Sequence, residues 1–298
     1  MTGWTIEDMP PLRDQTVVVT GANSGLGLEG SKAFARRGAT VVMACRSVER
    51  GESAAKEIRD AVPNATLDVR ECDLADLSNV ASFADGLRAD YDAVDILCNN
   101  AGVMAIPRSE TADGFETQFG VNHLGHFALT GHLLDLLGAA DSESRIVTQS
   151  SGAHEMGEID FDDLQRERSY GKWSAYGQSK LANLLFAYEL QRRLGNHGWD
   201  DVLSVACHPG YADTDLQFRG PREMGSTLRT AAMGVANAVF AQSAEQGALP
   251  MLYAATAEDV IGGEYVGPGG LFDMRGSPEF QQSNDASQDE ETAEQLWA

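Results

Sequence analysis

The sequence has no apolar run long enough to cross a membrane. Its 298 residues are 43% hydrophobic, which is enough for a buried core, yet no run approaches the roughly 18 residues that a membrane helix needs. The first residues, M-T-G-W-T-I-E-D-M-P-P, lack the basic and then hydrophobic pattern of a secretory signal. We therefore expect a cytoplasmic protein without a membrane anchor.

Cysteine is scarce, and no two cysteines form a C-x-x-C pair. Each lies in or beside an apolar run: Cys45, Cys72, Cys98 and Cys207. This pattern predicts buried free thiols rather than disulfides or metal ligands. His123, His126 and His132 are close in sequence, but no matching carboxylate or cysteine set accompanies them, so we predict no metal site.

Basic residues are few, and only four of them are lysines. The sequence has 22 basic and 45 acidic residues, which gives a formal net charge of −23. Binding to a phosphate backbone needs clustered Lys and Arg, so nucleic acid is not an expected partner. The acidic residues are spread along the chain, which predicts a hydrated surface whose self-repulsion salt would screen. A halophilic, prokaryotic source is the corresponding hypothesis.

Short β-branched runs alternate with helical segments along the chain. Strands are predicted at residues 16–20, 39–45, 66–71, 95–98, 145–150, 202–207 and 263–266. Helices are predicted at residues 24–37, 49–59, 78–88, 113–137 and 173–194. Such alternation indicates a single-domain α/β Rossmann fold, with a seven-stranded, mostly parallel, doubly wound sheet in the order 3-2-1-4-5-6-7.

One domain accounts for this pattern, because no linker-like segment interrupts it. We expect an N-terminal extension over residues 1–13 and the Rossmann domain over residues 14–280. Residues 281–298 form an acidic C-terminal tail whose composition predicts loose order. Two loops, residues 152–172 and 211–245, are expected to contact the substrate.

A glycine-rich turn, T-G-A-N-S-G-L-G (20–27), joins the first predicted strand to the first helix. Glycines at this turn let the backbone approach a pyrophosphate, and the helix N-terminus offers free N–H groups. The spacing is G-x-x-x-G-x-G rather than G-x-G-x-x-G. The predicted cofactor contacts in this turn are Gly21, Asn23, Ser24, Gly25, Leu26 and Gly27.

The ends of the next strands predict the rest of a dinucleotide site. A carboxylate after the second strand would hold the 2′-hydroxyl of NAD, but Arg46 stands there, and a guanidinium suits the 2′-phosphate of NADP. Asp73 and Leu74 follow the third strand, near the adenine. Asn100, Ala101 and Gly102 follow the fourth strand and form a wall for the cofactor.

Tyr176 and Lys180 are four residues apart on a predicted helix and therefore share one face. A phenol titrates near 10 and is a poor acid or base at neutral pH. A nearby ammonium favours the phenolate, so we expect Lys180 to lower the pKa of Tyr176 towards the range that acid–base catalysis requires.

Taken together, the motifs resemble the short-chain dehydrogenase/reductase family. They are T-G-A-N-S-G-L-G, N-N-A-G, V-N-H-L-G-H-F, T-Q-S-S-G, Y-G-Q-S-K and H-P-G, in the family's order. The segments M-A-C-R-S, N-N-A-G-V-M and S-K-L-A-N-L-L-F are similar to its retinol dehydrogenase-like and WW-domain oxidoreductase-like branch.

This resemblance implies roles for particular residues. Asn122, Ser151, Tyr176 and Lys180 match the family's catalytic set. Strand alternation should turn only one of Ser150 and Ser151 into the site, and the resemblance implies that it is the second serine, Ser151. Lys180 would also hold the nicotinamide ribose. The remaining implied cofactor contacts are Pro209, Gly210 and Thr214.

The implied function is an NADP-dependent oxidoreductase that interconverts an alcohol and a ketone or aldehyde. A small-molecule substrate is expected, and family members commonly form dimers or tetramers through two long helices. Two alternatives stay open. One is a light-dependent protochlorophyllide reductase-like C=C reductase, which is similar in G-L-G-L and M-A-C-R. The other is a non-catalytic regulatory protein that binds NADPH.

Overall fold

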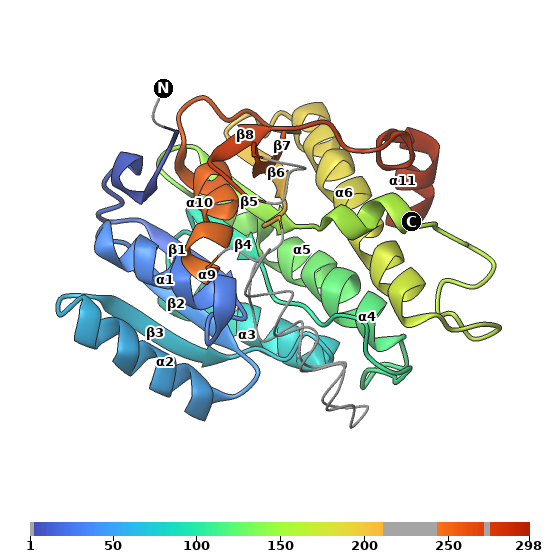
Figure 1. Cartoon of the computed structure of the whole chain (residues 1–298). Coiled ribbons are helices and arrows are strands. Elements are labelled where there is room, and N and C mark those ends of the chain that lie inside the picture. The colour runs from blue at the N-terminus through green and yellow to red at the C-terminus, as the bar shows by residue number, and fades with distance from the viewer. Residues whose placement is uncertain (1–2, 211–242, 271–274) are drawn as a thin grey trace.

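Eight strands form one sheet in the computed structural model, which describes residues 3–210, 243–270 and 275–298 (Figure 1). The strand order is β3-β2-β1-β4-β5-β6-β7-β8. The strands are β1 (Thr16–Thr20), β2 (Thr40–Cys45), β3 (Thr66–Glu71), β4 (Ile96–Asn99), β5 (Ser144–Gln149), β6 (Val202–Cys207), β7 (Tyr265–Pro268) and β8 (Pro278–Phe280). All neighbouring strands are parallel except β7 and β8.

The predicted α/β fold and the order of the first seven strands are confirmed, but the predicted strand count is one short. The eighth strand, Pro278–Phe280, pairs antiparallel with β7 at the edge of the sheet. It has only three residues and begins with a proline, which is tolerated at the start of an edge strand. Such a short segment carries no alternating pattern that the sequence could reveal.

Helices cover both faces of the sheet. On one face lie α1 (Gly25–Arg36), α2 (Val48–Ala61) and α10 (Leu249–Thr256); on the other lie α3 (Leu77–Asp90), α5 (Gly125–Leu137) and α6 (Lys172–Asn196). Shorter helices are η1 (Ile6–Asp8), η3 (Gly152–Met156), α9 (Ala244–Gly247) and η5 (Asp285–Gln288). Within the described ranges, no helix combines the length and the apolar character that a membrane span requires.

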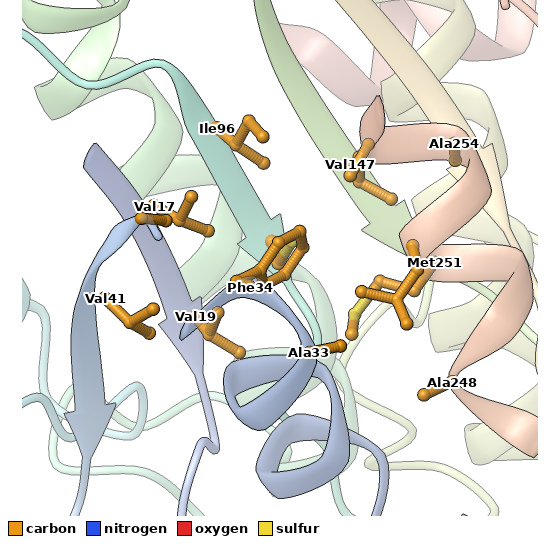
Figure 2. Packing of buried hydrophobic residues seen from close by; sticks show 14 of the residues in the cluster. Val17, Val19, Ala33, Phe34, Val41, Ile96, Val147, Ala248, Met251 and Ala254 are labelled. Atoms are coloured by element: carbon orange, nitrogen blue, oxygen red, sulfur yellow. The ribbon is translucent and has the colours of Figure 1, made fainter. Parts of the chain in front are cut away.

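One hydrophobic core lies between the sheet and the α1 face. Phe34 of α1 lies at its centre, beside Val19 of β1 and Met251 of α10 (Figure 2). All three side chains are buried. Because parallel strands covered on both faces read as continuous apolar runs, β1 and β2 were visible in the sequence as T-V-V-V-T and T-V-V-M-A-C.

The predicted helix over residues 113–137 differs from the observed one. Helical structure begins only at α4 (Thr117–Phe119), continues as a π-helix, η2 (Gly120–Leu124), and then as α5. Glu116 sets the start, because its carboxylate accepts from the backbone N–H groups of Gln118 and Phe119. A π-helical turn places the carbonyl of residue i opposite the N–H of residue i+5 and is frequent at functional sites.

The expectation of a loosely ordered C-terminal tail is wrong for its last residues. These form α11 (Glu290–Trp297), with Asp289 accepting from the N–H of Thr292 at the start. Trp297 stacks on Phe186 of α6, with ring centroids 5.8 Å apart, and meets Phe127 of α5 edge-on at 5.0 Å. The apolar segment 181–190 of α6 is accordingly buried within the chain, so its composition alone is no argument for an interface between subunits.

Candidate active site

The glycine turn between β1 and α1 has a backbone that only glycine adopts readily. Gly21 and Gly25 have φ angles of +67° and +54°, in the left-handed region that side chains disfavour. A Cβ at Gly27 would stand 2.4 Å from the carbonyl oxygen of Gly21. The turn therefore forms a cradle whose shape depends on missing side chains, and it lies at the N-terminus of α1, where anions bind well.

This turn opens onto a crevice of about 230 Å³ at the carboxyl ends of β1 to β4. The crevice contains twelve of the predicted cofactor residues: Gly21, Asn23, Ser24, Gly25, Leu26, Gly27, Arg46, Asp73, Leu74, Asn100, Ala101 and Gly102. Ligands of open α/β sheets bind at this edge. The donors and small residues along the crevice match an extended dinucleotide with an anionic centre.

A second arginine in the crevice was missed by the sequence analysis. Arg50 lies four residues after Arg46, in the first turn of α2, and both line the crevice. Ser47 lies between them and accepts from the N–H of Arg50 as the first cap of that helix. The signal that could have identified Arg50 is its place in the first turn of the helix that follows β2, close to the carboxyl edge of the sheet.

Thr20 ties the wall at the end of β4 to the end of β1. Its hydroxyl oxygen accepts from the N–H groups of Asn100 and Ala101, at 2.9 and 3.0 Å. The Asn100 amide in turn donates to the Thr20 carbonyl at 2.8 Å. Thr20 was not among the predicted site residues, although it lies in the first position of the glycine motif.

Asn122 lies on the π-helix and clamps two neighbouring segments. Its Oδ1 accepts from the N–H of Val103 at 2.8 Å, and its Nδ2 donates to the Val103 carbonyl and to the Ser179 hydroxyl, both at 2.9 Å. The side chain is fully buried. It thus joins the segment after β4, which lines the crevice, to α6 at Ser179, the residue before Lys180.

Tyr176, Ser151 and Lys180 lie together beside this clamp. Tyr176 and Lys180 are buried on α6, and the Ser151 hydroxyl lies close enough to the Tyr176 phenol to lower its pKa. Lys180 Nζ donates to the Gln149 carbonyl at 3.0 Å and lies 5.8 Å from the Tyr176 ring centroid. A Cβ on Gly102 would stand 3.8 Å from Lys180 Nζ, so this group adjoins the crevice wall.

The adjacent Ser150 has a different environment. Its hydroxyl donates to the backbone carbonyl of Lys180 at 2.8 Å and is buried. Ser151, in contrast, accepts from the N–H of Ala153 at the start of η3 and is partly exposed. The two serines therefore face different ways, and of the pair it is Ser151 whose hydroxyl acts on the pKa of Tyr176.

The pKa of Tyr176 does not follow the expected direction. Burial raises it to about 12, against the lowering effect of the Ser151 hydroxyl. Burial also lowers the pKa of Lys180 to about 8. The expectation that Lys180 depresses the tyrosine pKa is not met, because the loss of hydration outweighs other effects on the phenol and the ammonium is directed at the Gln149 carbonyl.

The remaining predicted cofactor residues follow β6. Gly210 has a φ of +64° and donates its N–H to His208 Nδ1 at 3.3 Å. Pro209 precedes it at the carboxyl end of the same strand. Thr214 and residues 211–242 of the second predicted substrate loop lie outside the described residues.

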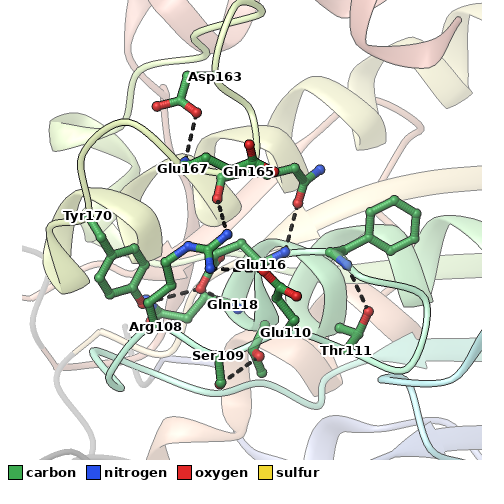
Figure 3. Close-up of polar contacts among 12 residues, drawn as sticks. Arg108, Ser109, Glu110, Thr111, Glu116, Gln118, Asp163, Gln165, Glu167 and Tyr170 are labelled. Carbon is green, nitrogen blue, oxygen red and sulfur yellow. Dashed lines mark hydrogen bonds and ion pairs between the residues drawn. The ribbon is translucent and has the colours of Figure 1, made fainter.

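A polar network that the sequence did not reveal holds residues 165–170 of the first predicted substrate loop (Figure 3). Gln118 Nε2 donates to the Tyr170 hydroxyl at 2.8 Å, and that hydroxyl donates to the Ile106 carbonyl at 3.0 Å. The N–H of Glu116 donates to Gln165 Oε1 at 2.7 Å. Residues 165–170 are thereby fastened to the segment that leads into the π-helix.

The cysteines and histidines show no sign of a metal site. Over residues 3–210, 243–270 and 275–298, no three His, Cys, Asp or Glu side chains are placed to hold an ion. The four cysteines are free and buried, as predicted. Burial lowers the pKa of His123 to about 4 and that of His126 to about 3, so both are neutral at physiological pH.

Comparison with known proteins identifies the family. A family model described as short chain dehydrogenase matches residues 15–223. The chain is 44% identical to human retinol dehydrogenase 13 over 301 residues, which covers 100% of this chain and 87% of that protein. It is 49% identical to human retinol dehydrogenase 12 over 205 residues, covering 69% of this chain and 64% of that protein.

Solved structures agree with this result. An uncharacterized protein from Mycobacterium paratuberculosis superposes with a TM-score of 0.80 at 42% identity, covering 99% of this chain and 98% of that one. A short chain dehydrogenase from Escherichia coli CFT073, complexed with NADPH, superposes with a TM-score of 0.58 at 25% identity, covering 70% and 82%. The chain is an oxidoreductase of the short-chain dehydrogenase/reductase family and belongs to its retinol dehydrogenase-like branch.

Proposed function

We propose that the protein is an NADP(H)-dependent oxidoreductase that interconverts an alcohol and a ketone or aldehyde, with Tyr176 as the general acid and base. The observation that carries the proposal is the arrangement of two side chains of α6. Lys180 Nζ adjoins Gly102 of the glycine-cradled crevice and lies 5.8 Å from the ring centroid of Tyr176, whose phenol lies close to Ser151. A proton donor next to a dinucleotide crevice is what carbonyl reduction needs.

The cofactor supplies the hydride, and the residues of the chain supply position and protons. In reduction, the Ser151 hydroxyl holds the carbonyl oxygen and the Tyr176 hydroxyl donates its proton to that oxygen. The raised pKa keeps the phenol protonated at neutral pH, ready for this direction. In oxidation, the Tyr176 phenolate accepts the proton of the alcohol, and the Ser151 hydroxyl favours that charge.

The preference for NADP(H) over NAD(H) has two supports. Arg46 and Arg50 line the crevice next to the end of β2, and guanidinium groups pair well with a 2′-phosphate. A related short chain dehydrogenase of known structure is complexed with NADPH. An acidic residue, which would hold the 2′-hydroxyl of NAD, is replaced by Arg46 at the end of β2.

An apolar substrate is the class that the rim of the site favours. Trp173 is 47% exposed, and its ring lies 6.2 Å from that of Tyr176. Met156 is 59% exposed and packs near Gly177, the next residue on α6. Large exposed apolar side chains beside a reactive hydroxyl offer a surface for a hydrocarbon group. The relatives named retinol dehydrogenases support the same class.

A panel of apolar aldehydes, ketones and alcohols tests the function through NADPH absorbance, with NADH as the comparison cofactor. Tyr176→Phe should lower kcat by about 10²- to 10⁴-fold while the Kd for NADPH changes little. The control is Tyr188→Phe, on the same helix, whose hydroxyl pairs with Ser283 instead. Near-normal turnover of Tyr176→Phe would contradict the assignment, and turnover only under illumination would favour the C=C reductase.

A further inference from the structure

His126 of α5 has no part in the proton transfers proposed above, yet it lies between the two halves of the site. The side chain is 1% exposed. Its Nδ1 is 3.0 Å from the backbone carbonyl oxygen of Asn122, and its Nε2 is 2.9 Å from the Thr20 hydroxyl. One imidazole thus connects the π-helix to the end of β1.

The partners of His126 determine which nitrogen carries the proton. A carbonyl oxygen can only accept, so Nδ1 must be the donor towards Asn122. Burial, together with the charge of Lys180, lowers the pKa of His126 to about 3, so the ring is neutral and Nε2 has no proton. Nε2 must then accept, and the Thr20 hydroxyl is the donor within reach. We assign the Nδ1–H tautomer on this basis.

The Thr20 hydroxyl completes the connection. Its single proton has two acceptors in range, His126 Nε2 at 2.9 Å and the Cys98 carbonyl at 3.2 Å. Donation to the imidazole is favoured because it is shorter and because Nε2 would otherwise be a buried acceptor without a partner. The oxygen of the same hydroxyl accepts from Asn100 and Ala101 of the cofactor wall.

We propose that His126 is a positioning residue that fixes the Asn122 carbonyl on one side and the Asn100–Ala101 cofactor wall on the other through a single tautomer. The proposal rests on the function proposed above. Two hydrogen bonds are assigned separate effects. The bond from Nδ1 holds the π-helix against α6 through Asn122 and Ser179 and acts on kcat. The bond to Nε2 holds the wall through Thr20 and acts on cofactor affinity.

Two variants separate these bonds. In His126→Asn the amide nitrogen takes the place of Nδ1 and keeps the donor to Asn122, but nothing reaches Thr20. In His126→Gln the amide reaches the Nε2 position, and the donor to Asn122 is lost. Since a neutral hydrogen bond corresponds to about a 3- to 10-fold effect, His126→Asn should raise the Kd for NADPH by that factor with kcat nearly unchanged. His126→Gln should lower kcat by that factor with the Kd nearly unchanged.

His132→Asn is the matched control, because His132 lies on the same helix and is partly exposed; both constants should stay at wild-type values. A direct readout is nitrogen NMR of the protein labelled with ¹⁵N-histidine. The signal that disappears in His126→Asn should show a protonated Nδ1 and an unprotonated Nε2 at pH 6 to 8.

The outcomes separate this proposal from the proposed function. An Nε2-protonated or cationic ring overturns the assignment of His126. The assignment also fails if kcat and NADPH affinity fall equally in both variants and these losses follow the decrease in melting temperature. If the wild-type protein turns over no carbonyl or alcohol, the proposed function fails. The NMR signal then still shows whether His126 is the Nδ1–H tautomer. The NADPH affinities still show whether it positions the Asn100–Ala101 wall.

Discussion

The two halves of the carboxyl edge of the sheet are built by different means. Around β1 to β4 the crevice is shaped by backbone and by glycines such as Gly21 and Gly27 that cannot carry a side chain. Around β5 and α6 the site consists of buried polar side chains, each with a particular partner, such as Lys180 on the Gln149 carbonyl. The shape of the first half therefore depends on the absence of side chains at these glycines. The geometry of the second half depends on hydrogen bonds between buried polar groups.

Changing Gly27 to Ala should produce the largest effect on the first half. The added Cβ would stand 2.4 Å from the Gly21 carbonyl oxygen, so the turn must shift. Overpacking of about 1–3 kcal/mol corresponds to a loss of NADPH affinity of about 5- to 150-fold, measured by titration. Gly131→Ala is the control, because a Cβ there meets nothing within 4 Å; it should raise helix stability by about 0.5–1 kcal/mol. Unchanged NADPH binding in Gly27→Ala would show that the shape of the turn does not depend on a missing side chain at residue 27.

Lys180 offers a matching test of the second half, through the pH dependence of stability. Its pKa falls from 10.5 to about 8 in the folded state. Between these values the unfolded chain binds more protons, so this group makes the unfolding free energy rise with pH, by about 1.4 kcal/mol per unit. Lys180→Met removes this term. Between pH 8 and 10 the unfolding free energy of the wild-type protein should therefore rise relative to that of the variant, as measured in denaturant titrations. Both proteins carry the same cysteines and Tyr176, so the titration of those groups cancels in the difference. Parallel curves would contradict the burial of the charge.

Arg50 provides the smallest and most specific change. Arg50→Ala should weaken NADPH binding by about 3- to 10-fold, the range for one exposed charged hydrogen bond, without affecting NADH. Lys56→Ala removes a cation from the same helix at an exposed position paired with Asp60 and should alter neither affinity. Equal losses for both cofactors would mean that Arg50 does not read the 2′-phosphate.

The same contrast explains what the sequence could predict. Glycine turns and β-branched strands are local features of the sequence. Short motifs therefore predicted the order of seven strands and the crevice residues of the T-G-A-N-S-G-L-G and N-N-A-G segments. The pairings of Asn122 and Thr20 join segments 19 and 80 residues apart, and no local pattern encodes them. Strand alternation predicted that Ser150 and Ser151 face different ways, and the choice of Ser151 came from the family resemblance.

Three features lay beyond the sequence for other reasons. The π-helix joins α4 directly to α5, so the sequence predicted one continuous helix over residues 113–137. The helix α11 is acidic, and it packs on α6 through only a few apolar residues, Ala293, Leu296 and Trp297. The pKa of Tyr176 depends on its burial, which the four-residue spacing to Lys180 does not report.

The contact between Trp297 and Phe186 has a consequence for biosynthesis. The helix that carries Tyr176 and Lys180 leaves the ribosome about a hundred residues before the segment that covers its outer side. Until that segment arrives, the aromatic rings of Phe127 and Phe186 lack the indole that packs on them. A partly synthesised chain consequently exposes these apolar rings, one of them on the helix that carries Tyr176 and Lys180. We expect chaperones to bind this surface until the C-terminal helix covers it.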